Sequence, residues 1–290
     1  MNIARHYGAG KFGLSFELFP PKTAEGEKAL YRHVAELHKF DPDFITCTYG
    51  AGGSTRDKTL DIVTRIRDEF GCPVASHLTC VGATVNQLRY YLREATERGI
   101  DYIVALRGDP PKGESEFKPV GGGLRYANEL VALIRAEFPH FGIAVAGYPE
   151  SHQEAPSPEV DLENLKRKVD AGGQVVITQL FYTNADFYRF RERCEAAGIN
   201  VPLVPGVLPV TNFAQIQRIT SLCGARLPDS FVESLGGCGD DQEAQFKAGV
   251  EFATSQVQDL IDHQIPGIHF YVLNKSQATA SVLRAVTRPA

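Results

Sequence analysis

The feature that most constrains the fold of this chain is a regular alternation of strand-like and helix-like segments. Short apolar runs that favour strands occur at residues 12–18, 44–49, 74–80, 102–108, 143–148, 175–181, 201–207 and 268–273. Helical patterns lie between them at residues 24–40, 55–70, 85–99, 124–138, 160–172, 185–197, 211–223 and 242–263, and a last helix is expected after Asn274. The first strands begin about 30 residues apart, which is the length of one strand–helix unit.

Eight such units predict a closed barrel rather than an open sheet. Strands that are apolar over most of their length are typical of a parallel sheet covered by helices. A dinucleotide-binding sheet would carry G-x-G-x-x-G at its first strand-to-helix turn, whereas GAGK at 8–11 is misplaced and incomplete. The phosphate-loop pattern is missing as well, and no linker divides the chain. We therefore predict one α/β domain over residues 1–290, a (β/α)8 TIM barrel with extra helices.

The composition excludes several classes of function. The chain has 290 residues, a net charge of −5 and no basic block, which argues against a surface for nucleic acid or an anionic membrane. It shows neither a signal-peptide pattern nor an apolar run long enough to span a bilayer. The six cysteines lack C-x-x-C spacing, and Cys47 and Cys80 lie within apolar runs. We expect reduced core thiols in a cytoplasmic protein, with neither disulfides nor a metal site.

Polar side chains mark seven of the eight predicted strands near their carboxyl ends, and in a barrel those ends meet at one mouth. In chain order they are Glu17, Thr48 with Tyr49, His77 with Thr79, Arg107 with Asp109, Tyr148 with Glu150, Thr178 with Gln179, and Tyr271 with Asn274. A single carboxylate in such a place is often only a cap for the next helix. Seven polar ends around one mouth predict an active site there.

The run SFELFPPK at 15–22 places a carboxylate in an otherwise apolar strand. Side chains alternate along a strand, so Leu14, Phe16 and Leu18 would face the helices while Ser15 and Glu17 face the barrel interior. A carboxyl group held among apolar neighbours at the rim should have a raised pKa, which suits a general acid.

The run RGDPP at 107–111 brings a second carboxylate to the mouth. Asp109 follows Arg107 by two residues, and the two side chains could form a simple surface ion pair. Alternatively, Gly108 would let a ligand approach the backbone closely, and the two prolines would stiffen the exit from the strand.

The stretch DLENLKRKVDAGG at 161–173 is rich in charge. In a helix the side chains of Asp161, Asn164 and Lys168 share one face, with Arg167 beside them. Such a face is either solvated or a binding site for phosphates or a ribose.

Nine short runs between residues 15 and 274 form a series. They are SFELFPPK, TCTYGAGGSTRD (46–57), HLTC (77–80), IVALRGDPP (103–111), AGYPESH (146–152), DLENLKRKVDAG (161–172), ITQLFY (177–182), PGVLPV (205–210) and HFYVLN (269–274). In this order they resemble the catalytic domain of methylenetetrahydrofolate reductases, and the length resembles the short bacterial form. The resemblance implies a (β/α)8 barrel that holds FAD without a dinucleotide-binding fingerprint.

The resemblance also implies an activity and its partners. In a ping-pong reaction, NADH or NADPH would reduce FAD and leave. The substrate 5,10-methylenetetrahydrofolate would then receive the hydride and become 5-methyltetrahydrofolate. All partners would be small molecules, and the family suggests a homo-oligomer. The sequence shows no acidic fingerprint or 2′-phosphate-binding arginine that would separate NADH from NADPH.

Carried over by motif, three residues would act on the substrates. Glu17 would be the general acid that protonates the leaving N10 of the folate and so opens its five-membered ring to an iminium. Asp109 would lie near the flavin and the pterin, where its negative charge tunes the flavin potential and stabilises the cation. Gln179 would hydrogen-bond the nicotinamide and the pterin in turn.

The resemblance assigns a larger set of residues to FAD. The matching positions are Thr48, His77, Arg107, Gly108, Asp109, Tyr126, Ala127, Tyr148, His152, Asp161, Asn164, Arg167 and Lys168. Arg167 and Lys168 would face the pyrophosphate, and Asp161 the adenosine part. For the charged helix, the resemblance therefore favours a binding site over a solvated face.

Three places depart from the family pattern. The stretch 112–127, which contains Tyr126, is longer than expected. Lys275 stands where an arginine is expected, and it would bind the carboxylate of a folate glutamate tail without a bidentate fork. Ile219 stands where an aromatic side chain would stack on the folate, and Phe213 is the alternative for that contact.

Other interpretations of the same barrel differ in chemistry. A proline-dehydrogenase-like enzyme would keep FAD and oxidise an amino acid. A pterin-binding methyltransferase would be non-redox and would need a corrinoid partner or a zinc–thiolate site, which the cysteine spacing does not support. A folate-binding protein without catalysis is a third class, and the rich array of polar strand ends argues against it.

Overall fold

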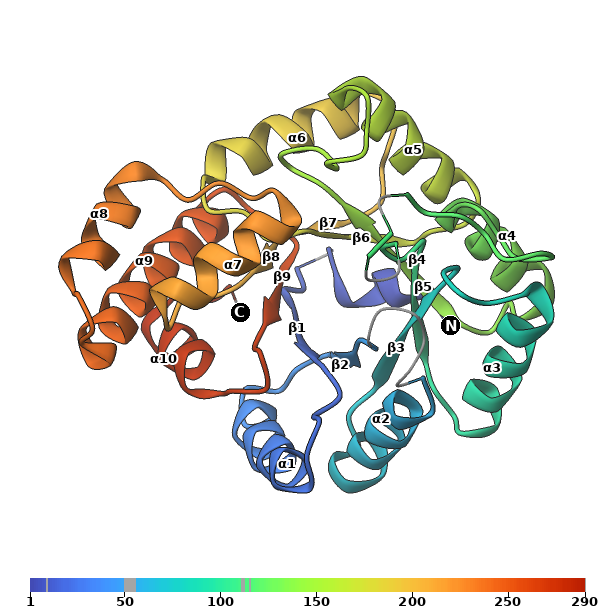
Figure 1. Ribbon diagram of the computed structural model, residues 1–290, viewed down its shortest axis with the longest axis horizontal. Coiled ribbons are helices and arrows are strands. Elements are labelled where there is room, and N and C mark those ends of the chain that lie inside the picture. The colour runs from blue at the N-terminus through green and yellow to red at the C-terminus, as the bar shows by residue number, and fades with distance from the viewer. Residues whose placement is uncertain (9, 50–55, 111–112, 115, 290) are drawn as a thin grey trace.

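The computed structural model describes residues 1–8, 10–49, 56–110, 113–114 and 116–289, and its strands form a barrel inside a ring of helices (Figure 1). The strands are β1 (Gly13–Leu18), β2 (Phe44–Cys47), β3 (Val74–Thr79), β4 (Tyr102–Leu106), β5 (Gly142–Gly147), β6 (Val175–Thr178), β7 (Leu203–Val204), β8 (Gly206–Val207) and β9 (Gly267–Tyr271). The helices are α1 (Ala24–His38), α2 (Arg56–Phe70), α3 (Val85–Glu97), α4 (Ala127–Glu137), α5 (Pro158–Asp170), α6 (Asn184–Ala196), α7 (Phe213–Cys223), α8 (Asp229–Gly237), α9 (Gln242–Asp262) and α10 (Gln277–Ala285), preceded by the 3₁₀ turn η1 (Ile3–His6).

The barrel closes through one strand that a proline interrupts. The paired strands are parallel and follow the order β7-β6-β5-β4-β3-β2-β1-β9-β8. Only Pro205, which has no N–H to donate, separates β7 from β8, so the segment pairs with β6 on one side and with β9 on the other. The Pro205 carbonyl still accepts a hydrogen bond from the backbone N–H of His269 at 3.0 Å. The predicted (β/α)8 barrel is therefore confirmed.

The element ends differ from the prediction in a consistent way. Several strands leave the ladder two or three residues early, as β2 does at Cys47 and β6 at Thr178, because the polar residues that follow turn into the loops of the mouth. Helix α5 begins at Pro158 rather than at residue 160, since the Ser157 hydroxyl caps it by accepting from the backbone N–H of Val160. The short elements α8 and η1 were not predicted. Residues 50–55 and 111, which belong to two of the quoted runs, lie outside the described residues.

Strand β1 has the predicted alternation. Leu14, Phe16 and Leu18 belong to the main apolar core between strands and helices, while Ser15 and Glu17 point into the barrel. A second apolar cluster, which includes residues from η1, β2 and β4, fills the amino-terminal end of the barrel interior. The open space of the barrel is thereby restricted to the carboxyl ends of the strands.

The six cysteines are unpaired, and Cys47, Cys72, Cys80 and Cys194 are buried. The expectation of core thiols is therefore confirmed for Cys47 and Cys80. Within the described ranges, the search for a helix with the length and apolarity of a membrane span found none.

Gly249 of α9 is a point where the fold tolerates no side chain. A Cβ atom there would overlap the backbone carbonyl of Val210, the residue that ends the PGVLPV run beside the mouth. We predict that Gly249→Ala lowers the free energy of unfolding by about 1–3 kcal/mol through overpacking. Calorimetry should show a lower Tm than that of the wild type.

The matched control is Gly236→Ala in α8, where a Cβ would meet nothing within 4 Å. That change should leave stability unchanged or raise it by up to about 1 kcal/mol, because alanine favours the helix. Equal melting temperatures for the two variants would contradict close packing at Gly249.

Candidate active site

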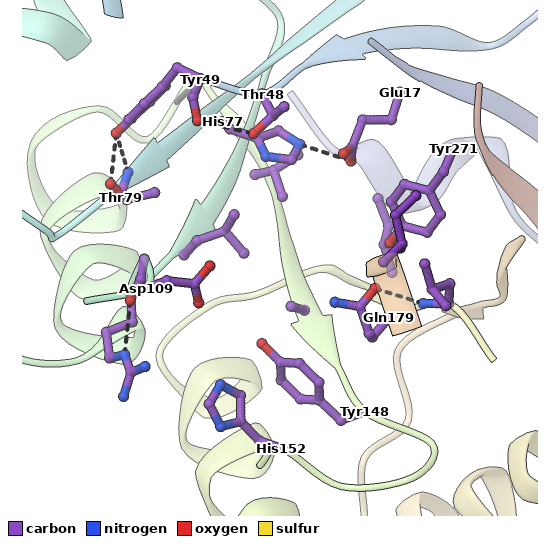
Figure 2. Close-up of a pocket in the computed structure, with 18 of the residues that line it drawn as sticks. Glu17, Thr48, Tyr49, His77, Thr79, Asp109, Tyr148, His152, Gln179 and Tyr271 are labelled. Carbon is purple, nitrogen blue, oxygen red and sulfur yellow. Dashed lines mark hydrogen bonds and ion pairs between the residues drawn. The ribbon is translucent and has the colours of Figure 1, made fainter. Parts of the chain in front are cut away.

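A cavity of about 440 Å³ opens at the carboxyl ends of the strands (Figure 2). Its polar lining consists of Glu17, Thr48, Tyr49, His77, Thr79, Arg107, Asp109, Tyr148, His152, Gln179 and Tyr271. These side chains come from seven different strands or the loops that follow them. The convergence predicted from the polar strand ends is therefore what the barrel produces.

Glu17 lies between two imidazoles. Its Oε2 atom is 3.2 Å from Nε2 of His77 on β3 and 3.5 Å from Nε2 of His269 on β9. The carboxyl side chain is 19% exposed and reaches the cavity, whereas His269 is fully buried behind it. Figure 2 shows His77 and Glu17 pointing toward each other across the cavity wall.

The predicted rise in the pKa of Glu17 was wrong for this arrangement. Burial by itself raises the pKa of the carboxyl group, but the charge of His77 and the hydrogen bonds from both imidazoles outweigh it and lower the pKa to about 2. The apolar neighbours of Glu17 in sequence point away from it, and its true neighbours are histidines from other strands. The free carboxyl group is therefore ionised at neutral pH.

The opposite wall of this cavity is held by hydrogen bonds between strands. The Tyr271 hydroxyl donates to the carbonyl of Thr178 at 2.8 Å, and the Thr178 hydroxyl accepts from the backbone N–H of Gly206 at 2.9 Å. The side-chain oxygen of Gln179 accepts from the backbone N–H of Leu180 at 2.9 Å. This contact leaves the amide N–H groups of Gln179 available to a ligand.

A second cavity of about 460 Å³ adjoins the first. The two share Leu106, Arg107, Ala146, Tyr148 and His152. The lining that belongs to the second cavity alone includes Tyr126, Ala127, Asn128, Glu154, Asp161, Asn164, Arg167 and Lys168. The two cavities thus adjoin through these shared residues.

A partly buried lysine gives the second cavity a positive charge. The Lys168 ammonium donates to the carbonyl of Ala146 at 2.6 Å and lies 5.7 Å from the centre of the Tyr148 ring. Burial lowers its pKa to about 8, although the nearby Asp161 opposes the shift. Burial in turn raises the pKa of Asp161, whose carboxylate accepts from the backbone N–H of His152 at 3.2 Å.

Arg107 stands where the two cavities meet, and a carboxylate binds it there. Its guanidinium donates to both oxygens of Glu154 in a bidentate pair, at 2.6 and 2.7 Å. Such a fork is among the stronger side-chain contacts. An anionic ligand that used Arg107 would have to compete with Glu154.

The residues predicted from the sequence occupy distinct places in this site. The residues that the resemblance assigned to FAD and the substrates all line one cavity or the other, with the exception of Lys275. Three of the polar strand ends, Glu150, Thr178 and Asn274, line neither. Lys275 lies beyond the rim, at a small separate hollow next to Leu273. Ile219 lines the first cavity, whereas Phe213 packs into an apolar cluster with Leu208 and does not line it. The structure therefore does not place Phe213 at this cavity, and its contact with the folate stays a prediction.

Two residues of the site were missed. His269 alternates with Tyr271 on β9, and this period of two could have placed it inside the barrel. Glu154 carries no comparable signal, because its partner Arg107 is 47 residues away. Across the ranges given above, no cluster of three or more histidine, cysteine or acidic side chains could hold a metal ion.

Comparisons with known proteins agree with this geometry. A family model described as "Methylenetetrahydrofolate reductase" matches residues 2–287. The 5,10-methylenetetrahydrofolate reductase of Escherichia coli K12 is 41% identical over 273 residues, which cover 94% of this chain and 90% of that protein. The Arabidopsis thaliana protein named methylenetetrahydrofolate reductase (NADH) 1 is 37% identical, over 94% of this chain and 48% of its own length.

Among solved structures, a Clostridium thermocellum protein described as binding two copies of 5-methyl-5,6,7,8-tetrahydrofolic acid is similar to the barrel. The TM-score is 0.63 with 15% sequence identity, and 94% of each chain is covered. At this identity the likeness supports the fold alone.

We predict that Glu17→Gln makes stability less dependent on pH in the acid range. The folded-state pKa of about 2 lies below the ordinary value of 4.5. Ionised Glu17 therefore stabilises the fold above pH 4.5, and this contribution is lost as the pH falls toward 2. The difference in Tm, wild type minus variant, should fall as calorimetric scans move from about pH 6 to about pH 3.

The control for net charge is Glu192→Gln, which removes an exposed carboxylate from α6. After subtraction of this control, a difference in Tm that stays constant or grows toward low pH would show that the barrel does not favour the ionised form of Glu17.

Proposed function

Because the chain belongs to the methylenetetrahydrofolate reductase family, we propose that it reduces 5,10-methylenetetrahydrofolate to 5-methyltetrahydrofolate, with NADH or NADPH as electron donor and FAD as cofactor. The observation that carries the proposal is the pair of joined cavities at the mouth of the barrel. One contains a carboxylate beside imidazoles, and the other contains two partly buried cations, Lys168 and Arg107. The first suits proton transfer to a substrate, and the second suits a nucleotide.

The residues present fit FAD. Nε2 of the buried His77 faces Glu17, whereas its Nδ1 lacks a hydrogen-bond partner among the described residues, as expected of a side chain that awaits a ligand. The first turn of α4, at Tyr126 and Ala127, faces the second cavity, and helix N-termini favour phosphate. Lys168 and Arg107 add positive charge beside it. We propose that these groups hold the phosphates and that Asp161 binds the adenosine part.

When bound, FAD supplies the hydride carrier between the nicotinamide and the one-carbon unit of the folate. The protein groups around the first cavity position both substrates. Gln179, with free amide N–H groups, can bind a nicotinamide amide or a pterin. Asp109 is exposed at the mouth, where a fixed negative charge would stabilise a cationic folate intermediate.

The size of the first cavity supports alternation of the two substrates. A volume of about 440 Å³ is that of a site for one small ligand. Part of it would be taken by the flavin ring, and the remainder suits one substrate at a time. We therefore propose a ping-pong order, in which the nicotinamide leaves before the folate enters.

Glu17 would act as the acid of the folate step. Protonation of N10 makes it a leaving group, so that the five-membered ring opens to the iminium that accepts the hydride. No proton is needed at this position while the nicotinamide is oxidised. The two half-reactions should therefore depend on Glu17 to very different extents.

The test is anaerobic stopped-flow absorbance on the purified yellow holoenzyme. NADH or NADPH should bleach the flavin spectrum, and methylenetetrahydrofolate should restore it. In Glu17→Gln the bleaching rate should remain near that of the wild type, whereas the recovery should slow by about 10²- to 10⁴-fold. The bleaching step of the same variant is the internal control.

Three outcomes would each overturn part of the proposal. A preparation that stays colourless after incubation with FAD would refute the cofactor assignment. Bleaching by proline, with no recovery on addition of the folate, would indicate a different flavin enzyme. Equal slowing of both steps in Glu17→Gln would refute its role as the acid.

A second prediction concerns the ion pair at the junction of the cavities. Glu154→Gln removes the carboxylate that binds Arg107, so FAD phosphates would meet an unpaired guanidinium. The Kd for FAD, measured by fluorescence titration of the apoprotein, should fall by about two- to fivefold, in line with the energy of a partly exposed ion pair.

The matched control is Glu159→Gln on α5, which removes an exposed charge that does not contact Arg107. It should leave the Kd unchanged. Weaker binding of FAD in Glu154→Gln would show that Glu154 orients Arg107 for the cofactor instead of competing with it.

A further inference from the structure

Helix α7 forms part of the wall of the first cavity, although it does not belong to the main core of the barrel. Ile219, in the second half of the helix, lines that cavity. Ile216 and Phe213 pack into an apolar cluster that is distinct from the main core. The position of this wall therefore depends on contacts outside the main core.

Polar contacts hold both ends of α7. At its start, the backbone N–H of Phe213 donates to Oε1 of Gln245 on α9 at 2.9 Å. The buried Gln245 in turn donates from its amide to the carbonyl of Gly239 at 2.6 Å. At its end, the carbonyl of Leu222 accepts from Nε2 of Gln153 at 3.4 Å. Gln153 belongs to the loop between β5 and α5, so α7 is held between α9 and this loop.

An ion pair strengthens the contact with the loop. Arg226, three residues after the end of α7, donates from Nε to Oε1 of Glu150 at 2.9 Å, and its backbone N–H donates to Oε2 at 3.2 Å. Its guanidinium also lies 3.9 Å from the carboxylate of Asp186 on α6, which Arg189 pairs as well. The side chains of Glu150 and Asp186 are each 10% exposed, whereas Arg226 is 77% exposed. Arg226 thus neutralises carboxylates that the fold has largely removed from water.

The β5–α5 loop contacts α7 on one side and the ligand cavities on the other. Tyr148 and His152 line both cavities, whereas Glu150 lines neither. Ser151, between Glu150 and His152, has a φ of 72°, a left-handed conformation that is uncommon for a residue other than glycine. The backbone N–H of His152 donates to the Asp161 carboxylate at 3.2 Å. The loop is therefore fixed from the cavity side and offers Glu150 to α7.

The end of α7 touches the loop directly beside this ion pair. Gly224 ends the helix in a left-handed conformation with a φ of 77°, and its N–H donates to the carbonyl of Thr220 at 2.8 Å. A Cβ atom on Gly224 would lie 2.5 Å from Nε2 of Gln153. The helix end and the loop are therefore closely packed, and the position of one sets the position of the other.

We propose that Glu150 and Arg226 are positioning residues for the folate. Their ion pair docks α7 on the β5–α5 loop and so holds Ile219 in the wall of the substrate cavity. The inference rests on the proposed function, in which the folate occupies the first cavity. Neither residue of the pair lines a cavity, so their effect on the reaction passes through α7.

Such a pair acts on binding and leaves the chemical step alone. When α7 leaves the loop in a fraction of the molecules, the cavity is incomplete in that fraction. The apparent affinity for the folate then falls in proportion to the fraction that stays docked. Saturating folate selects the docked molecules and restores the full rate. A weakened pair should therefore raise the folate concentration that gives half the maximal rate, with the maximal rate unchanged.

The experiment measures flavin recovery in the NADH-reduced holoenzyme as a function of methylenetetrahydrofolate concentration. Arg226→Glu places a third carboxylate beside Glu150 and Asp186, so like-charge repulsion should move α7 off the loop. The half-saturating folate concentration should rise about five- to twentyfold, with the limiting rate within about twofold of the wild type. Bleaching by saturating NADH should be unchanged. The Kd for FAD should be unchanged too, because Asp161 fixes the cavity side of the loop.

Reversal of both charges separates the ion pair from general damage to the fold. Glu150→Arg alone should also raise the half-saturating folate concentration. Combined with Arg226→Glu, it restores an attraction between the two positions, so the double variant should have a lower value than either single variant. The matched control is Arg218→Glu, the same change of charge at an exposed position of α7 that lines neither cavity. It should leave the half-saturating concentration unchanged.

The possible failures are distinguishable. A wild type that NADH bleaches but the folate does not restore would refute the proposed function itself. Normal recovery in the wild type, with half-saturating concentrations that do not change in either single variant, would overturn the positioning role alone. A double variant no better than the worse single variant would also overturn it. So would a limiting rate that falls while the half-saturating concentration stays the same.

Glu150→Gln provides the test if Arg226→Glu does not fold. The amide keeps an oxygen for the backbone N–H of Arg226 and removes the charge. The half-saturating folate concentration should rise about two- to fivefold, as expected for a pair whose arginine is exposed. An unchanged value in Glu150→Gln would overturn the proposal.

Discussion

The parallel pairing of β1 with β9 is the constraint on which the candidate site depends. It sets Ser15 opposite His269 and Glu17 opposite Tyr271. Because side chains alternate along each strand, this one register brings all four into the barrel and leaves the bulky apolar residues between them to face the helices. A slip by one residue would exchange the two sets and bury the acid among leucines and phenylalanines. The pairing of β1 with β9 that closes the barrel therefore also brings the side chains of the site together.

A polar layer inside a barrel is stable only if its members neutralise one another. The floor of this barrel is apolar, but the layer above it contains a carboxylate and two imidazoles within 3.5 Å. These partners are what holds Glu17 ionised, since burial alone would favour its neutral form. The imidazoles that stabilise the ionised carboxylate of Glu17 thus leave little of it protonated at neutral pH.

Much of the fold and of the site follows from local pattern. Alternation of strand and helix gave the barrel, and polar strand ends gave Glu17, His77 and Gln179 their place at the mouth. The direction of the pKa shift of Glu17 could not be predicted, because the groups that lower it are His77 and His269 on other strands, the latter 252 residues away. A strand period shows that a side chain points inward but not which side chain it meets. The partner of an inward-pointing side chain is set only when β1 pairs with β9 and the barrel closes.

The same principle governs the junction of the two cavities. A site for charged ligands has to satisfy its own charges when no ligand is bound, since an unpaired buried charge is costly. Arg107 does so through Glu154, and Glu17 does so through His77 and His269. The two pairs differ in one respect that decides their roles. The Glu154 side chain lies at the edge of the site and is 42% exposed, so a ligand can displace it. His269 is fully buried behind Glu17, where a ligand in the cavity does not displace it.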